Sequence, residues 1–190
     1  MKTCRAMKRN STLKTVLALS LMATVMTSCS SDDDTPEVVN EEEIITTMTV
    51  TLTSANGSAT LQSQDLDGDG PNAPVVTADN LSANTTYTGS IVLLNETETP
   101  AEDITEEVEE EADEHQFFFG LSGSLSEVTY SDTDEDGNPV GLEFELTTGD
   151  AGSGTITITL RHEPTKPNDG TLADAGGETD IAQTFSVTVE

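Results

Sequence analysis

The sequence predicts a mainly β protein: an antiparallel β-sandwich of Ig-like or Greek-key type, with one acidic helix inserted between strands. Apolar and polar residues alternate over short stretches such as 140–146, and this period of two indicates strands with one buried face. Turn-forming pairs such as Asn56-Gly57 separate the stretches. The alternating stretches and the turns between them predict about seven to nine short strands in residues 44–190, as expected of a single sandwich domain.

The first 28 residues have the form of a secretory leader. Basic residues precede a short apolar core, Val16 to Met26, which is too short to span a bilayer. The core runs into the tetrapeptide MTSC, which ends at Cys29, and small residues before a Cys resemble the lipobox of bacterial lipoproteins. Residues 1–28 are therefore predicted to be a lipoprotein signal peptide and Cys29 the lipidated residue. An ordinary leader with an incidental Cys is the alternative.

Residues 29–43 are predicted to be an acidic, disordered tether, since they carry no apolar periodicity. The tract that follows Cys29, SSDDD, resembles the acidic export tract of Bacteroidota-type surface lipoproteins. That resemblance implies a lipid-anchored protein of the outer membrane, facing the periplasm or the cell surface.

The charge of the chain excludes several classes of ligand. The chain has 36 acidic and 7 basic residues and a net charge of −29, and after the leader only Arg161 and Lys166 are basic. Such a field repels polyphosphate, which excludes nucleic acid and anionic lipid as direct ligands and favours cations or basic protein surfaces. The domain after Cys29 contains no cysteine, so it has no disulfide, no thiolate metal site and no Cys nucleophile.

The strands are expected in two groups. In the first half of the domain, alternation places them at residues 44–52, 59–64, 75–78 and 86–94. After the acidic helix they are expected at residues 116–121, 124–130, 140–146, 155–163 and 181–189. Thr, which has a high strand propensity, fills many of the solvent-facing positions.

Between these groups, residues 100–114 are predicted to form the acidic helix. Thr99 can cap it, Pro100 suits its first position, and Glu102 completes a capping box. Like-charged side chains then repeat at a spacing of four, and each such pair costs on the order of 0.2–0.5 kcal/mol. A cation, a basic partner or salt is therefore expected beside the helix.

The two histidines lead to the prediction of a transition-metal site. His115 follows the helix, with Glu111 one turn before it and Glu114 adjacent. His162 is the inward-facing residue that ends a strand. Two imidazoles with one or two carboxylates suit Zn²⁺ or a similar ion. The alternative is structural, with His115 capping the helix C-terminus and His162 at the rim of the sheet.

A calcium loop is predicted in the turn that precedes the strand at 140–146. Its ligands would be Asp132, Asp134, Asp136 and Glu143. They fit the EF-hand pattern DxDxDG-x5-E, in which carboxylates converge on Ca²⁺. The flanking segments are strands rather than helices, so an acidic hairpin turn is the alternative.

Three segments carry a resemblance to a known family: residues 84–119, 130–143 and 155–164. They resemble small acidic lipoproteins of Bacteroidota, which often carry the label type 1 periplasmic binding fold superfamily protein. That label implies a two-lobed α/β fold, whereas the strand pattern predicts a β-sandwich. Lipoproteins of this kind often serve TonB-dependent outer-membrane transporters, so the resemblance implies an uptake accessory.

The sequence contains no nucleophile elbow, no phosphate-binding glycine loop and no Cys–His pair, so an enzyme is not expected. The expected function is that of a membrane-anchored lipoprotein that binds a divalent cation, Zn²⁺ or Ca²⁺, as an accessory to nutrient or metal uptake. The alternative is a structural or interaction module whose acidic face docks a basic protein partner.

Overall fold

The computed structural model describes residues 43–68 and 70–190. The predicted signal peptide 1–28, the lipidation of Cys29 and nearly all of the tether 29–43 lie outside the described residues. No helix in the described part combines the length and the apolar character that crossing a membrane requires.

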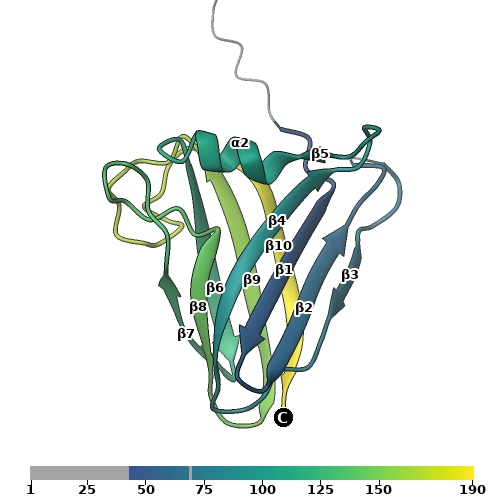
Figure 1. Ribbon diagram of the computed structural model, residues 1–190, viewed down its shortest axis with the longest axis vertical. Helices are drawn as coiled ribbons and strands as arrows, with labels where there is room; N and C mark the ends of the chain where they lie inside the picture. Colours follow the sequence, from purple (N-terminus) through teal and green to yellow (C-terminus); the bar gives the residue numbers. More distant parts are fainter. Residues whose placement is uncertain (1–42, 69) are drawn as a thin grey trace, which may run out of the picture. The chain divides into compact units, whose positions relative to one another are not determined.

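In the described chain, ten strands form two antiparallel sheets, with one short helix between strands (Figure 1). The larger sheet has the order β3-β2-β1-β4-β8-β7, and β5 pairs with β4. Its strands are β1 Thr47–Ser54, β2 Gly57–Gln64, β3 Val75–Ala78, β4 Thr86–Asn95, β5 Glu102–Asp103, β7 Leu125–Tyr130 and β8 Glu143–Thr148. The smaller sheet, in the order β10-β9-β6, consists of β6 His115–Gly123, β9 Gly152–His162 and β10 Glu178–Val189. The prediction of a mainly β fold is confirmed.

One hydrophobic core joins the two sheets. Alternate residues of β1, such as Val50, are buried in the same cluster as Ile158 of β9 and Phe185 of β10. On β4, Gly89 leaves room for the ring of Phe144, because a Cβ at this position would overlap the ring. The alternation therefore predicts the buried faces correctly, and the sheets pack as a sandwich.

The predicted strands differ from the observed ones mainly at their ends. The alternation predicts a first strand from residue 44, whereas β1 begins at Thr47 and Ile44 is exposed. The strand predicted from residue 116 begins one residue earlier, at His115. Strand ends are less strongly determined than strand centres because fewer paired neighbours hold them.

The predicted helix start at Thr99 is wrong. The helix, α2, spans Ile104–Glu110, and its N-cap is Asp103, whose side chain accepts a hydrogen bond from the backbone N–H of Thr105 at 3.0 Å. Glu102 and Asp103 are not helical but pair with the end of β4 as β5. Pairing with β4 satisfies the backbone hydrogen bonds of Glu102 and Asp103, so the helix begins only after these two residues.

Contacts with the larger sheet fix the position of α2. Ile104 and Val108 are buried in the core. The Thr105 hydroxyl accepts a hydrogen bond from the backbone N–H of Leu93 at 3.0 Å, which ties the first turn of the helix to β4. Because β6 begins shortly after α2 ends, the helix also determines where His115 enters the smaller sheet.

Candidate metal centre

The pairing of β6 with β9 brings the two histidines together. His115 is the first residue of β6 and His162 the last residue of β9, and the antiparallel register places them directly opposite each other. Their ring centroids are 4.7 Å apart, and both residues are buried. The predicted meeting of the two imidazoles thus follows from the alignment of two neighbouring strand ends.

The hydrogen bonding of His115 leaves one ring nitrogen available for a ligand. Its Nδ1 lies 3.1 Å from the backbone oxygen of Glu111. A carbonyl oxygen can only accept, so Nδ1 carries a hydrogen and donates it. The other nitrogen, Nε2, lies 3.5 Å from Oε1 of Glu43. Metal-bound histidines commonly have this arrangement, in which one nitrogen bonds a backbone oxygen and the other faces the ion.

Glu43 also influences the charge of His115. Burial alone would lower the pKa of the imidazole, but the contact with Glu43, the Glu111 carbonyl and the charge of Asp180 together raise the pKa above its ordinary value. In the ion-free protein the contact with Glu43 therefore favours a proton on Nε2 of His115. An ion that binds there must displace this proton.

His162 lies between two carboxylates. Its Nδ1 is 3.9 Å from Oδ1 of Asp180, and its Nε2 is 3.8 Å from Oε2 of Glu114. The side chain of Asp180 is buried, and the residue lies at the β-bulge between Thr179 and Ile181 of β10. Because a bulge redirects the side chains around it, Asp180 reaches the imidazole from the neighbouring strand.

Three buried atoms at the histidine pair have no hydrogen-bond partner in the described chain: Oε2 of Glu43, Nε2 of His115 and Nε2 of His162. Buried polar atoms nearly always form hydrogen bonds, so three such atoms without a partner at one place require an explanation. One ligand atom from each of the three residues lies within 4.8 Å of the others. The group of Glu43, His115 and His162, called the buried centre below, could hold a metal ion.

The structure changes the predicted carboxylate ligands. Glu111 contributes its backbone oxygen rather than its carboxylate. Glu114 forms a different group, with His162 and Glu163. The carboxylate that contacts His115 is that of Glu43, and the sequence pattern predicts this residue in the tether because it precedes the first alternating stretch. Only its position directly before that stretch could have indicated a role.

The acidic helix itself contributes little to the buried centre. The side chains of Glu106, Glu109 and Glu110 are exposed, and α2 is only seven residues long. Fewer like-charged pairs therefore form than a helix over 100–114 would have, and solvent and salt screen them. Glu107 is partly buried, and burial, with the charges of its acidic neighbours, raises its pKa.

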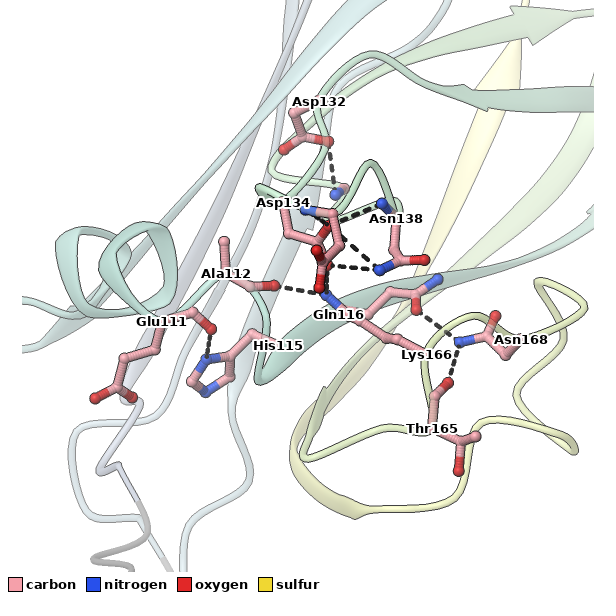
Figure 2. A network of polar contacts seen from close by, with 12 residues as sticks. Glu111, Ala112, His115, Gln116, Asp132, Asp134, Asn138, Thr165, Lys166 and Asn168 are labelled. Atoms are coloured by element: carbon pink, nitrogen blue, oxygen red, sulfur yellow. Dashed lines mark hydrogen bonds and ion pairs between the residues drawn. The ribbon is translucent and has the colours of Figure 1, made fainter.

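The structure does not assemble the predicted calcium ligands Asp132, Asp134, Asp136 and Glu143. The carboxylate of Asp132 accepts hydrogen bonds from the backbone N–H groups of Gly141 and Glu143, at 2.7 and 3.0 Å. That of Asp134 accepts one from the backbone N–H of Asn138 at 2.8 Å (Figure 2). The four residues form no group that could hold an ion in the part of the chain that the structure describes. The loop has the features of the acidic hairpin turn that is its alternative interpretation.

A lysine with a buried side chain supplies positive charge beside this loop. Nζ of Lys166 lies 3.2 Å from Oδ2 of Asp134 and donates a second hydrogen bond to the backbone oxygen of Ala112, just after α2 (Figure 2). Burial would raise the pKa of Asp134, but backbone hydrogen bonds and Lys166 lower it. Arg161 does not accompany Lys166 and instead donates to the backbone oxygen of Gly176 at 2.9 Å.

Comparison of the chain with protein-family models, with curated proteins and with solved structures finds no match. The resemblance to Bacteroidota lipoproteins therefore stays a prediction. A function has to be argued from the residues and the geometry of the buried centre.

The raised pKa of His115 predicts how the ion-free protein responds to pH. Because the folded state binds this proton more tightly than the unfolded chain does, the proton stabilises the fold fully below the unfolded pKa of 6.5. This contribution is lost as the pH rises through the higher folded pKa. We expect the free energy of unfolding, measured with urea in the presence of a chelator, to fall more steeply with rising pH in the native protein than in His115→Gln. Equal slopes would contradict the role assigned to Glu43.

Proposed function

We propose that the protein is a membrane-anchored, non-enzymatic lipoprotein that binds a divalent transition ion, Zn²⁺ in the first instance, and acts as an accessory to uptake at the outer membrane. One observation supports the ion-binding part: one ligand atom from each of two buried imidazoles and a carboxylate lies within 4.8 Å of the others, and Nε2 of each ring has no hydrogen bond within the described residues. The anchoring part is supported by the sequence, through its leader and Cys29.

Ligand chemistry favours Zn²⁺ over Ca²⁺ at the buried centre. Imidazole nitrogens suit Zn²⁺ and Cu²⁺, whereas Ca²⁺ binds about six to eight oxygens. The centre offers two imidazoles and one carboxylate, which leaves a fourth position for water or another ligand. Asp180 and the backbone oxygen of Glu111 lie beside the rings, where outer partners orient metal-bound histidines.

Burial favours binding rather than catalysis. The His115 side chain is fully buried, and that of Glu43 is only 10 % exposed. A catalytic ion needs an open position that a substrate can reach, and the cleft beside the centre is lined by Glu43 but by neither histidine. The sequence also lacks the catalytic motifs that would accompany such an ion.

Titration of the metal-stripped protein with Zn²⁺ and with Ca²⁺ tests the proposal. We expect about one Zn²⁺ per chain and no heat from Ca²⁺, because the donors are mainly nitrogen. Free Zn²⁺ at 100 times its Kd should raise the free energy of unfolding by about 2.7 kcal/mol. Calorimetry gives the stoichiometry, and thermal denaturation gives the stabilisation. A melting temperature that no ion changes would rule the proposal out.

A specific observation also supports the alternative, a module that docks a basic partner. Exposed acidic side chains line a hollow of about 350 Å³ near the end of α2. They are Glu109, Glu110, Asp113, Glu135 and Asp136. Binding of a basic protein at this surface would weaken with salt and would be indifferent to Zn²⁺, so the two functions can be separated in one set of measurements.

A further inference from the structure

We propose that Glu114, His162 and Glu163 form a second, solvent-facing ion position, called the outer position below, through which the ion reaches the buried centre. The inference rests on the proposed function, since it concerns the route to that same site. One ligand atom from each of the three residues lies within 4.8 Å of the others. The outer position and the buried centre share His162.

The shared imidazole has an atom directed at the outer position. Nε2 of His162 lies 3.8 Å from Oε2 of Glu114. This nitrogen is buried and has no hydrogen-bond partner in the described residues. The Glu114 side chain, by contrast, is 51 % exposed, and Glu163 is exposed as well. The outer position therefore joins a buried, unused ligand atom to carboxylates that solvent can reach.

A backbone hydrogen bond joins the two residues that carry these carboxylates. The N–H of Glu163 donates a hydrogen bond to the backbone oxygen of Glu114 at 2.7 Å, which links the end of β9 to the start of β6. Glu163 has a φ of 47°, a left-handed conformation that is strained for a residue with a Cβ. Strain of this kind is retained mainly at functional sites, and here it lies at the residue beside the shared histidine.

Sharing His162 allows the ion to move by exchange of its other ligands. An ion from solvent first meets Glu114 and Glu163, which are exposed and negatively charged and so raise its local concentration. It then exchanges them for Glu43 and His115 while His162 remains bound. Such an exchange avoids stripping the ion of all its ligands at once, which would carry a large desolvation penalty.

A cleft beside Glu43 offers a different route. This cleft of about 630 Å³ is lined by Glu43 and Asp180 and also by Asp65 and Asp67. An ion could approach Glu43 from this cleft without contacting Glu114. The two routes use separate carboxylates, so substitutions can distinguish them.

The rate of Zn²⁺ association, measured by stopped-flow competition with a fluorescent chelator, tests the route. The test variant is Glu114→Gln with Glu163→Asn, since Asn tolerates the left-handed conformation. We expect its association rate to fall about tenfold. Its Kd should change by less than about threefold, because the ligands of the buried centre remain and the dissociation rate falls with the association rate.

Two control variants remove the same number of charges elsewhere. Glu109→Gln with Glu110→Gln lies on the exposed side of α2, and Asp65→Asn with Asp67→Asn lies in the cleft. Both should associate with Zn²⁺ at nearly the native rate. If association slows equally in the α2 variant, only the overall negative charge of the protein sets the rate. If association slows only in the cleft variant, the ion enters through the cleft. Either result overturns the inference while leaving the buried centre intact. If the native protein binds no Zn²⁺, the proposed function fails together with the route.

Discussion

Replacing His115 by alanine is expected to lower the affinity for Zn²⁺ by at least about 100-fold. The imidazole provides one of three ligand atoms that lie within 4.8 Å of one another. Loss of an outer partner alone typically weakens metal binding about 10- to 100-fold, so loss of a direct ligand should cost at least the upper value. The ring is fully buried, and no exposed side chain can easily replace it. Calorimetry in competition with a chelator measures the change.

Glu111→Gln is the matched control for this prediction. The sequence pattern predicts the Glu111 carboxylate as a ligand, whereas in the structure only its backbone oxygen contacts His115. The glutamine variant keeps that oxygen, so its Zn²⁺ affinity should stay within about threefold of the native value. A large loss in Glu111→Gln, alongside the loss in His115→Ala, would contradict the structural assignment and favour the ligand set predicted from the sequence, in which both side chains bind the ion. Circular dichroism of both variants verifies that they are folded.

The strands could be predicted from the sequence because each depends on a local period of two. Val50 and Ile158, which the alternation predicts to face inward, are buried in the structure. The same parity places His162 inward at the end of its strand. Its meeting with His115 could be anticipated but not established, because it depends on the pairing of β6 with β9, and strand order cannot be read from alternation.

The remaining ligands could not be predicted because tertiary structure overrides local patterns. Glu43 belongs to no alternating stretch, and it reaches His115 only through the fold. Alternation with Ile181 would direct Asp180 outward, but the bulge in β10 changes the register at that residue. The prediction of the helix start is wrong for a similar reason. Thr99 and Pro100 form a good local start signal, but the chain after them pairs with β4 before it becomes helical.

Lys166 shows why the calcium motif misleads. A run of Asp residues that ends in Gly is compatible with an ion loop or with a turn, and the spacing alone cannot separate them. In the structure Lys166, which lies far along the sequence, provides the positive charge that Asp134 needs. One of the two basic residues after the leader is therefore committed to this loop rather than to the exposed face of α2.

Replacing Lys166 by methionine is expected to lower the free energy of unfolding by about 3–5 kcal/mol. The Lys166 and Asp134 side chains are only 6 % and 1 % exposed, and Nζ lies 3.2 Å from Oδ2. Methionine fills similar volume but leaves a buried carboxylate without its counter-charge, and this is the main cost of breaking such a pair. The backbone oxygen of Ala112 loses its donor as well. Urea denaturation measures the loss.

A double-mutant cycle with Asp134→Asn identifies the cause of this loss. Asparagine can still accept the backbone hydrogen bond from Asn138, which Asp134 accepts at 2.8 Å, but it carries no charge. If the unpaired carboxylate is responsible, adding Asp134→Asn to Lys166→Met should recover part of the stability, with a coupling energy of about 1–3 kcal/mol. Arg161→Met removes the same charge from a side chain that bonds backbone oxygens, so it should cost only about 1–2 kcal/mol. Equal losses in the two methionine variants, with no coupling to Asp134, would mean that packing rather than charge pairing joins this loop to the end of α2.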